Sequence, residues 1–166
     1  LALLTAGDNV IAVEVHQASA ASTDVVFGLS LEQVVDLPNG VYTNQMAILD
    51  GLQITELDYN PASGSQAHEF IELRNVGNVP LDLEGVRITE GVECVFPALT
   101  LQPGQYTVVV KDAAAFAARY GGGINVAGVY TGSLSNSGET LVVALPIPLD
   151  AAAIRFTYDS TYGVGI

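Results

Sequence analysis

The feature that most constrains this sequence is the alternation of apolar and polar residues in short runs, each closed by a turn signal. Clear examples are residues 9–16 (NVIAVEVH), 24–32 (DVVFGLSLE) and 68–76 (HEFIELRNV), and residues 106–111 (YTVVVK) add a continuous apolar run that predicts a buried strand. Successive side chains of a β-strand point to opposite faces, so such runs predict half-buried strands. Many short strands separated by turn residues predict a sandwich or a barrel.

Two further stretches refine the strand pattern. Residues 53–61 (QITELDYNP) place Leu57 and Tyr59 on one face, whereas Ile54 is out of phase with them. This predicts either a β-bulge or a side chain that serves a second sheet. Residues 81–91 (LDLEGVRITEG) predict two short strands separated at Gly85.

Helical character is confined to one stretch of the strand-rich region, at about residues 112–120. Asp112 is a good N-cap, alanine-rich residues follow it, and the glycines at 121–123 end the helix. Phe116 and Tyr120 are four residues apart and are expected to face the sandwich. The apolar residues of 35–51 do not recur with a sustained strand or helix period. We interpret this stretch as a linker with one short strand near Val41.

The charge balance narrows the range of partners. The chain carries 18 acidic and 5 basic residues, a net charge of −13, so nucleic acid is not an expected partner. No apolar run reaches the ~20 residues of a transmembrane helix, so membrane insertion is not expected. Scarce lysine, acidity and abundant small polar residues are typical of secreted or cell-surface proteins of bacteria. This composition therefore predicts an extracellular location.

Motifs for catalysis are missing from the sequence. It has no GxSxG elbow and no HExxH motif, and its single cysteine, Cys94, cannot form an intrachain disulfide. We therefore expect no enzyme activity and no cofactor except calcium, which binds carboxylate and amide oxygens. Asp58, Asn60 and Glu69 flank one loop and form the candidate calcium site.

The region from about residue 52 to 160 resembles the bacterial form of the lamin tail domain. The resemblance rests on motifs that occur in the family's order: ITELDYNP, HEFIELRNVG, LDLEGVRIT, VFP, LQPGQYTVVVKD, FAARYG, YTGSLSNSGETL and FTYD. It implies an all-β fold, an immunoglobulin-like antiparallel β-sandwich, with the short helix at about 112–120 between two of the strands. Residues 161–166 are then a C-terminal tail.

Residues 5–32 resemble the last two strands of a galactose-binding-like jelly roll. The domain organisation predicted is therefore a β-strand pair at 1–34, the linker at 35–51, the sandwich at 52–160 and the tail. Two amphipathic strands without their parent sheet leave an apolar face uncovered. The residues expected on that face are Ile11, Val13, Val15, Val25, Phe27 and Leu29.

Two functions follow from this organisation. The favoured one is a non-catalytic extracellular sandwich with a structural or adhesive role, which self-associates by strand addition through residues 9–32 into a filament or surface layer. The alternative is an accessory module, excised from a large secreted hydrolase, that binds protein or polysaccharide through its loops.

Overall fold

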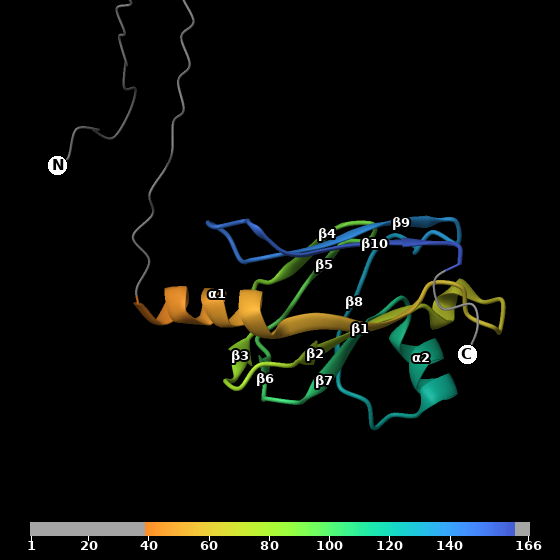
Figure 1. Cartoon of the computed structure of the whole chain (residues 1–166). Helices are drawn as coiled ribbons and strands as arrows, with labels where there is room; N and C mark the ends of the chain where they lie inside the picture. Colours follow the sequence, from red (N-terminus) through yellow and green to blue (C-terminus); the bar gives the residue numbers. More distant parts are fainter. Residues whose placement is uncertain (1–38, 162–166) are drawn as a thin grey trace, which may run out of the picture. The chain divides into compact units, whose positions relative to one another are not determined.

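Two four-stranded sheets face each other in the computed structural model, which describes residues 39–161 (Figure 1). The first sheet has the order β1 (Leu52–Asp58), β2 (Phe70–Asn75), β7 (Tyr106–Val110) and β8 (Val126–Val129). The second has the order β10 (Ala152–Asp159), β9 (Gly138–Ala144), β4 (Arg87–Glu90) and β5 (Cys94–Val95). Short strands β3 (Leu81–Asp82) and β6 (Thr100–Leu101) pair separately. The predicted all-β immunoglobulin-like sandwich is confirmed.

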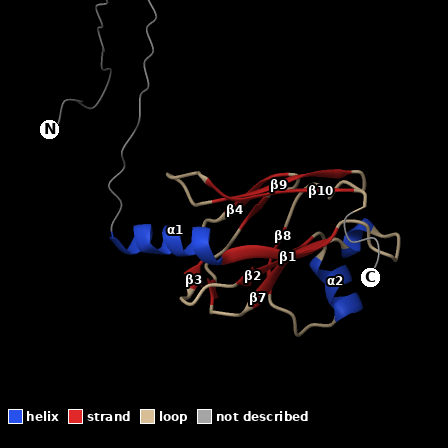
Figure 2. Cartoon of the chain, in the orientation of Figure 1, coloured by secondary structure: helices blue, strands red, loops and turns tan. Residues whose placement is uncertain are grey.

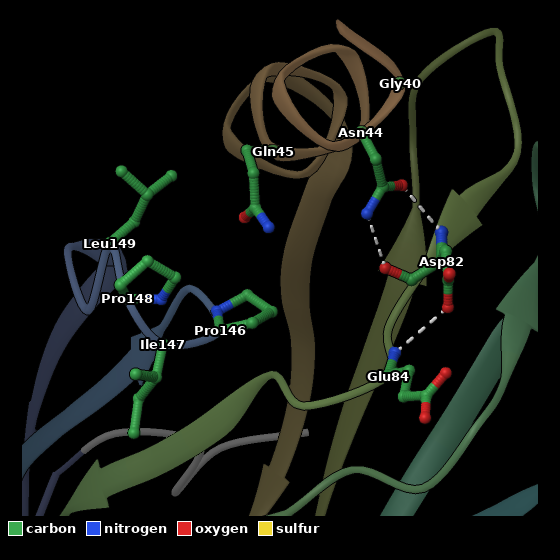
Figure 3. Close-up of a pocket in the computed structure, with 9 residues that line it drawn as sticks. All are labelled: Gly40, Asn44, Gln45, Asp82, Glu84, Pro146, Ile147, Pro148 and Leu149. Carbon is green, nitrogen blue, oxygen red and sulfur yellow. Dashed lines mark hydrogen bonds between the residues drawn. The ribbon is translucent and has the colours of Figure 1, made fainter. Parts of the chain in front are cut away.

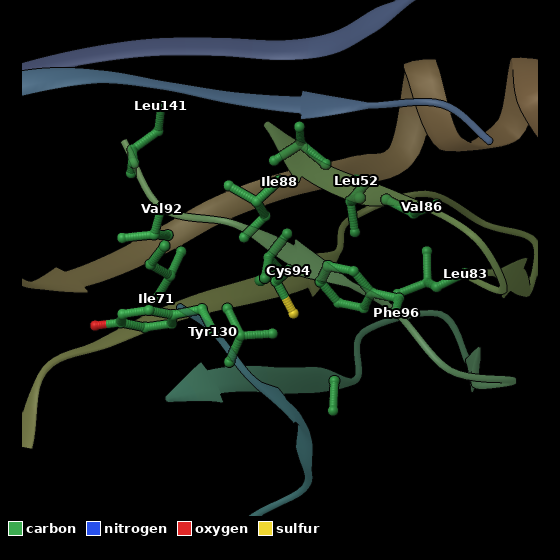
Figure 4. Close-up of a cluster of buried hydrophobic side chains, with 14 of the residues drawn as sticks. Leu52, Ile71, Leu83, Val86, Ile88, Val92, Cys94, Phe96, Tyr130 and Leu141 are labelled. Carbon is green, nitrogen blue, oxygen red and sulfur yellow. The ribbon is translucent and has the colours of Figure 1, made fainter. Parts of the chain in front are cut away.

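The core lies between the two sheets (Figure 4). Ile71 and Leu73 of β2 point inward and are fully buried, as the alternation predicted. Phe96, which follows β5, is among the largest buried side chains, and Cys94 packs beside it as a small apolar residue. Burial raises the pKa of the Cys94 thiol, so the group stays protonated at neutral pH.

The predicted helix is confirmed as α2 (Ala113–Tyr120). Asp112 Oδ1 accepts hydrogen bonds from the backbone N–H groups of Ala114 and Ala115, both at 2.9 Å. This helix carries the chain from β7 to β8, and that crossover allows these two strands to pair in parallel while the other pairs are antiparallel. Phe116 packs edge-on against Phe70 on the outer face of the first sheet.

The prediction of a linker with a strand near Val41 is wrong for residues 39–51, which form helix α1 (Asn39–Gly51) and lead directly into β1 (Figure 2). Among the described residues of α1, the buried positions are Gln45, Ile48 and Gly51, spaced as the inner face of a helix. One of these buried positions is a glutamine, which interrupts the apolar periodicity expected of a helix. The one-helix prediction is therefore corrected to two α-helices within the described residues.

The out-of-phase Ile54 is explained by a β-bulge, the first of the two alternatives. The pairing of β1 with β2 shifts register between Ile54 and Glu56, which lets Ile54 pack against the core. A 3₁₀ turn, η1 (Gln66–His68), precedes β2. Within residues 39–161, neither α-helix has the length and apolar character needed to cross a bilayer.

Candidate functional site

The three predicted calcium ligands lie in different surroundings. Asp58 ends β1 half-buried and accepts a hydrogen bond from the Tyr120 hydroxyl at 3.2 Å. Asn60 is exposed in the following loop, and Glu69 is fully buried. No cluster of three or more His, Cys, Asp or Glu residues suited to a metal occurs between residues 39 and 161. Asn60 is not one of these four residue types, so the calcium site stays a prediction.

Glu69 is directed at the loop formed by residues 130–138, which we call the anchored loop. Its Oε2 accepts hydrogen bonds from the Tyr130 hydroxyl at 3.1 Å and from the Leu134 N–H at 3.0 Å. Its Oε1 is buried and has no hydrogen-bond partner within the described chain. Glu69 lies two residues before the inward Ile71, so the same alternation that predicted Ile71 also places Glu69 on the inner face.

A second carboxylate holds the other end of the anchored loop. Glu139 Oε1 accepts hydrogen bonds from the Ser135 N–H at 2.8 Å and from the Tyr158 hydroxyl at 2.9 Å. The Tyr158 ring packs on Tyr59, with 4.7 Å between centroids. The loop is therefore fixed to β2 through Glu69 and to β10 through Tyr158, so it links the two sheets.

The burial of Glu69 changes its acid strength. Burial raises the pKa of this carboxyl, and the nearby Glu139 adds to the rise; the two donors from Leu134 and Tyr130, with Lys111, oppose it. The folded state therefore holds the Glu69 proton more tightly than the unfolded chain does. Consequently, Glu69 makes the wild-type protein lose stability as the pH rises through the raised pKa.

Substitution Glu69→Gln tests this effect. Glutamine keeps the shape and one acceptor oxygen but does not titrate. We therefore expect the variant to gain stability relative to the wild type as the pH rises from about 4 to about 8. Urea unfolding at several pH values measures the difference, and Glu72→Gln, on the other face of β2, controls for the loss of one negative charge. A difference that falls with pH would contradict the assignment.

A serine–histidine contact lies in the loop before β2. Ser63 Oγ is 2.6 Å from Nδ1 of His68, and both groups are at the surface. In a catalytic pair, a third group orients the base. Within the described part of the chain, no residue hydrogen-bonds the other ring nitrogen of His68. The contact serves the local turn, in which the Ser65 N–H also bonds to Ser63.

The sandwich has two sides at which the edge strands of the two sheets meet, and these sides differ in their backbone pairing. On one side, β5 and β8 lie together, and the backbones of Glu93 and Thr131 join this side by a two-hydrogen-bond bridge. On the other side, β1 and β10 lie together as the outer strands of the two sheets (Figure 1). These are long strands of seven and eight residues. The residues predicted to donate strands, on 9–32, lie outside the described residues.

A pocket of about 350 Å³ is a further candidate that sequence reasoning missed (Figure 3). It lies between α1, the segment at Asp82 and Glu84, and the turn at residues 146–149. Ile147 of that turn is 72% exposed, so an apolar side chain is held in solvent at the rim. The turn at residues 146–149 supplies one wall, but the pocket also needs α1, which the sequence pattern did not reveal.

These features define the class of the protein: an immunoglobulin-like β-sandwich module with a fixed interstrand loop. The family model of the lamin tail domain matches residues 48–147, more than half of the chain, and the chain belongs to that family. Members of the family are generally not enzymes. No curated protein sequence matches the chain. The predicted resemblance to the lamin tail domain is thus confirmed, whereas the jelly-roll resemblance of residues 5–32 stays a prediction.

Proposed function

We propose that this protein is a structural or adhesive β-sandwich that acts outside the cell and self-associates by strand addition through residues 9–32. The observation that carries the proposal is the side of the sandwich formed by β1 and β10. Among the described strands, each of these two is paired on one side. A strand edge offers a row of backbone donors and acceptors, which is the template for an added strand.

The sequence supplies a suitable donor. Residues 9–32 contain two alternating runs whose apolar residues need a partner surface. If the runs of one copy add to the edge of another, the contact is head-to-tail, and it propagates into a filament or a surface layer. Because each copy carries a net charge of −13, assembly must overcome repulsion, and bound calcium would reduce that repulsion.

Substitution Val13→Asp tests the proposal. We expect the full chain to form a concentration-dependent series of multimers in light scattering, and the variant to remain monomeric, because a charged side chain cannot be buried in the added sheet. The measurement is made with calcium and then with a chelator; loss of the multimers in chelator would identify calcium as part of the contact.

A matched control separates the apolar face from general disruption. Ala12→Asp introduces the same charge on the opposite face of the same run and should leave assembly intact. Unchanged assembly of Val13→Asp would contradict strand addition through this segment. A wild-type monomer in both buffers would favour the alternative, an accessory module that binds protein or polysaccharide.

A further inference from the structure

We propose that the pocket beside α1 binds a primary ammonium group carried on an aliphatic chain, as in a lysine side chain of a partner polypeptide. The proposal is independent of strand addition, because the pocket uses no residue from 9–32. It rests on three properties of the pocket: a buried oxygen without a partner in the described chain, two exposed carboxylates that form no ion pair there although Asp82 Oδ1 accepts the Glu84 N–H at 3.1 Å, and an exposed apolar wall.

The buried oxygen belongs to Gln45. This side chain is 5% exposed, it reaches from α1 toward Pro146 and Pro148, and its Oε1 has no hydrogen-bond partner within residues 39–161 (Figure 3). A buried acceptor without a donor is costly, and native structures rarely leave one unexplained. An incoming N–H donor would satisfy it.

The neighbouring Asn44 shows that the pocket is held in place. Its Nδ2 donates to the Asp82 carbonyl at 2.8 Å, and its Oδ1 accepts from the Asp82 N–H at 2.9 Å. The side chain thus extends the backbone pairing of β3 and fixes α1 against it. The backbone of α1 at Gln45 is therefore held beside the pocket.

The charge of the pocket selects a cation. Asp82 and Glu84 line it, both are exposed, and within the described chain neither carboxylate forms an ion pair. The opposite wall is apolar, formed by the side chains of Pro146, Ile147 and Pro148. An aliphatic stem fits this wall while its ammonium group faces the oxygens, which is how lysine buries its stem and solvates its head.

The experiment is an NMR titration of the isotope-labelled full chain with three probes. Nα-acetyl-lysine methylamide carries the ammonium and its stem. Nα-acetyl-norleucine methylamide keeps the stem without the charge, and 1,5-diaminopentane is a free diamine. We expect saturable shifts of the backbone amides of Asn44, Asp82 and Leu149 with the lysine probe. The norleucine probe should bind at least about fivefold more weakly, since its stem lacks the ion pair.

The double substitution Asp82→Asn with Glu84→Gln tests the carboxylates, and it leaves the backbone bonds to Asn44 in place. Affinity for the lysine probe should fall about fivefold, whereas Glu93→Gln, which removes a charge outside the pocket, should leave it unchanged. Absence of saturable shifts, equal binding of norleucine, or an unaffected double variant would overturn the proposal. Tighter binding of diaminopentane than of the lysine probe would identify a free diamine as the source of the ammonium group.

Discussion

Replacing Asn75 by alanine is expected to lower the free energy of unfolding by about 3–5 kcal/mol, because three backbone groups lose their partner at once. The Asn75 amide donates to the carbonyls of Val79 and Leu101, both at 2.8 Å, and accepts from the Gly77 N–H at 2.9 Å. Asn75 is the last residue of β2, and it is fully buried. Each orphaned buried group costs about 1–3 kcal/mol.

Urea unfolding followed by circular dichroism measures the change. Asn125→Ala is the matched control, since the exposed Asn125 makes one longer bond, at 3.3 Å to the Tyr106 carbonyl, and its loss should cost less than about 1 kcal/mol. Equal losses in the two variants would show that the amide of Asn75 does not hold the turn between β2 and β3.

Replacing Gly138 by alanine is expected to cost a similar amount, about 3–5 kcal/mol. Gly138 has a φ of 99°, which L-residues rarely adopt, and an added Cβ would lie 2.5 Å from the Tyr158 carbonyl oxygen and 2.6 Å from Cα of Asp159. The left-handed conformation accounts for about 1–2 kcal/mol, and the overlap with backbone atoms accounts for the rest. The end of β10 must move away from β9 to make room.

Gly104 separates the two contributions. Its φ is 79°, but an added Cβ there meets no atom within 4 Å, so Gly104→Ala should show the conformational cost alone. Thermal unfolding of both variants gives the comparison. If Gly104→Ala were as damaging as Gly138→Ala, the close approach of β9 and β10 would not be the cause of the loss.

The alternation of apolar residues was enough to predict strands such as β2, where Ile71 and Leu73 point inward, and hence a sandwich or a barrel. The choice of a two-sheet sandwich came from the resemblance to the lamin tail domain. The alternation failed for α1, where a glutamine, Gln45, occupies a buried position of the helical face. It also missed β8, whose residues Val126 and Val129 are largely exposed and whose pairing with β7 depends on the α2 crossover.

The site was harder to predict because it depends on which polar residues are buried. Glu69 and Asn75 stand at the two ends of the inner face of β2, in phase with Ile71 and Leu73. Sequence reasoning placed Glu69 beside a loop as a candidate calcium ligand, and a carboxylate is rarely buried. Its partners, Tyr130 and the Leu134 N–H, are more than sixty residues away, so only the fold brings them together.

Because Cys94 is buried, the rate at which its thiol reacts with a reagent reports the opening of the core. The thiol is the only one in the sequence, it is 7% exposed, and its protonated state makes it unreactive while the sandwich is closed. A thiol reagent at a concentration high enough to react before reclosing therefore labels Cys94 at the rate at which the corner between β4 and β5 opens. The native chain thus reports the kinetics of its core without an introduced probe, and any partner that clasps that corner will slow the reaction.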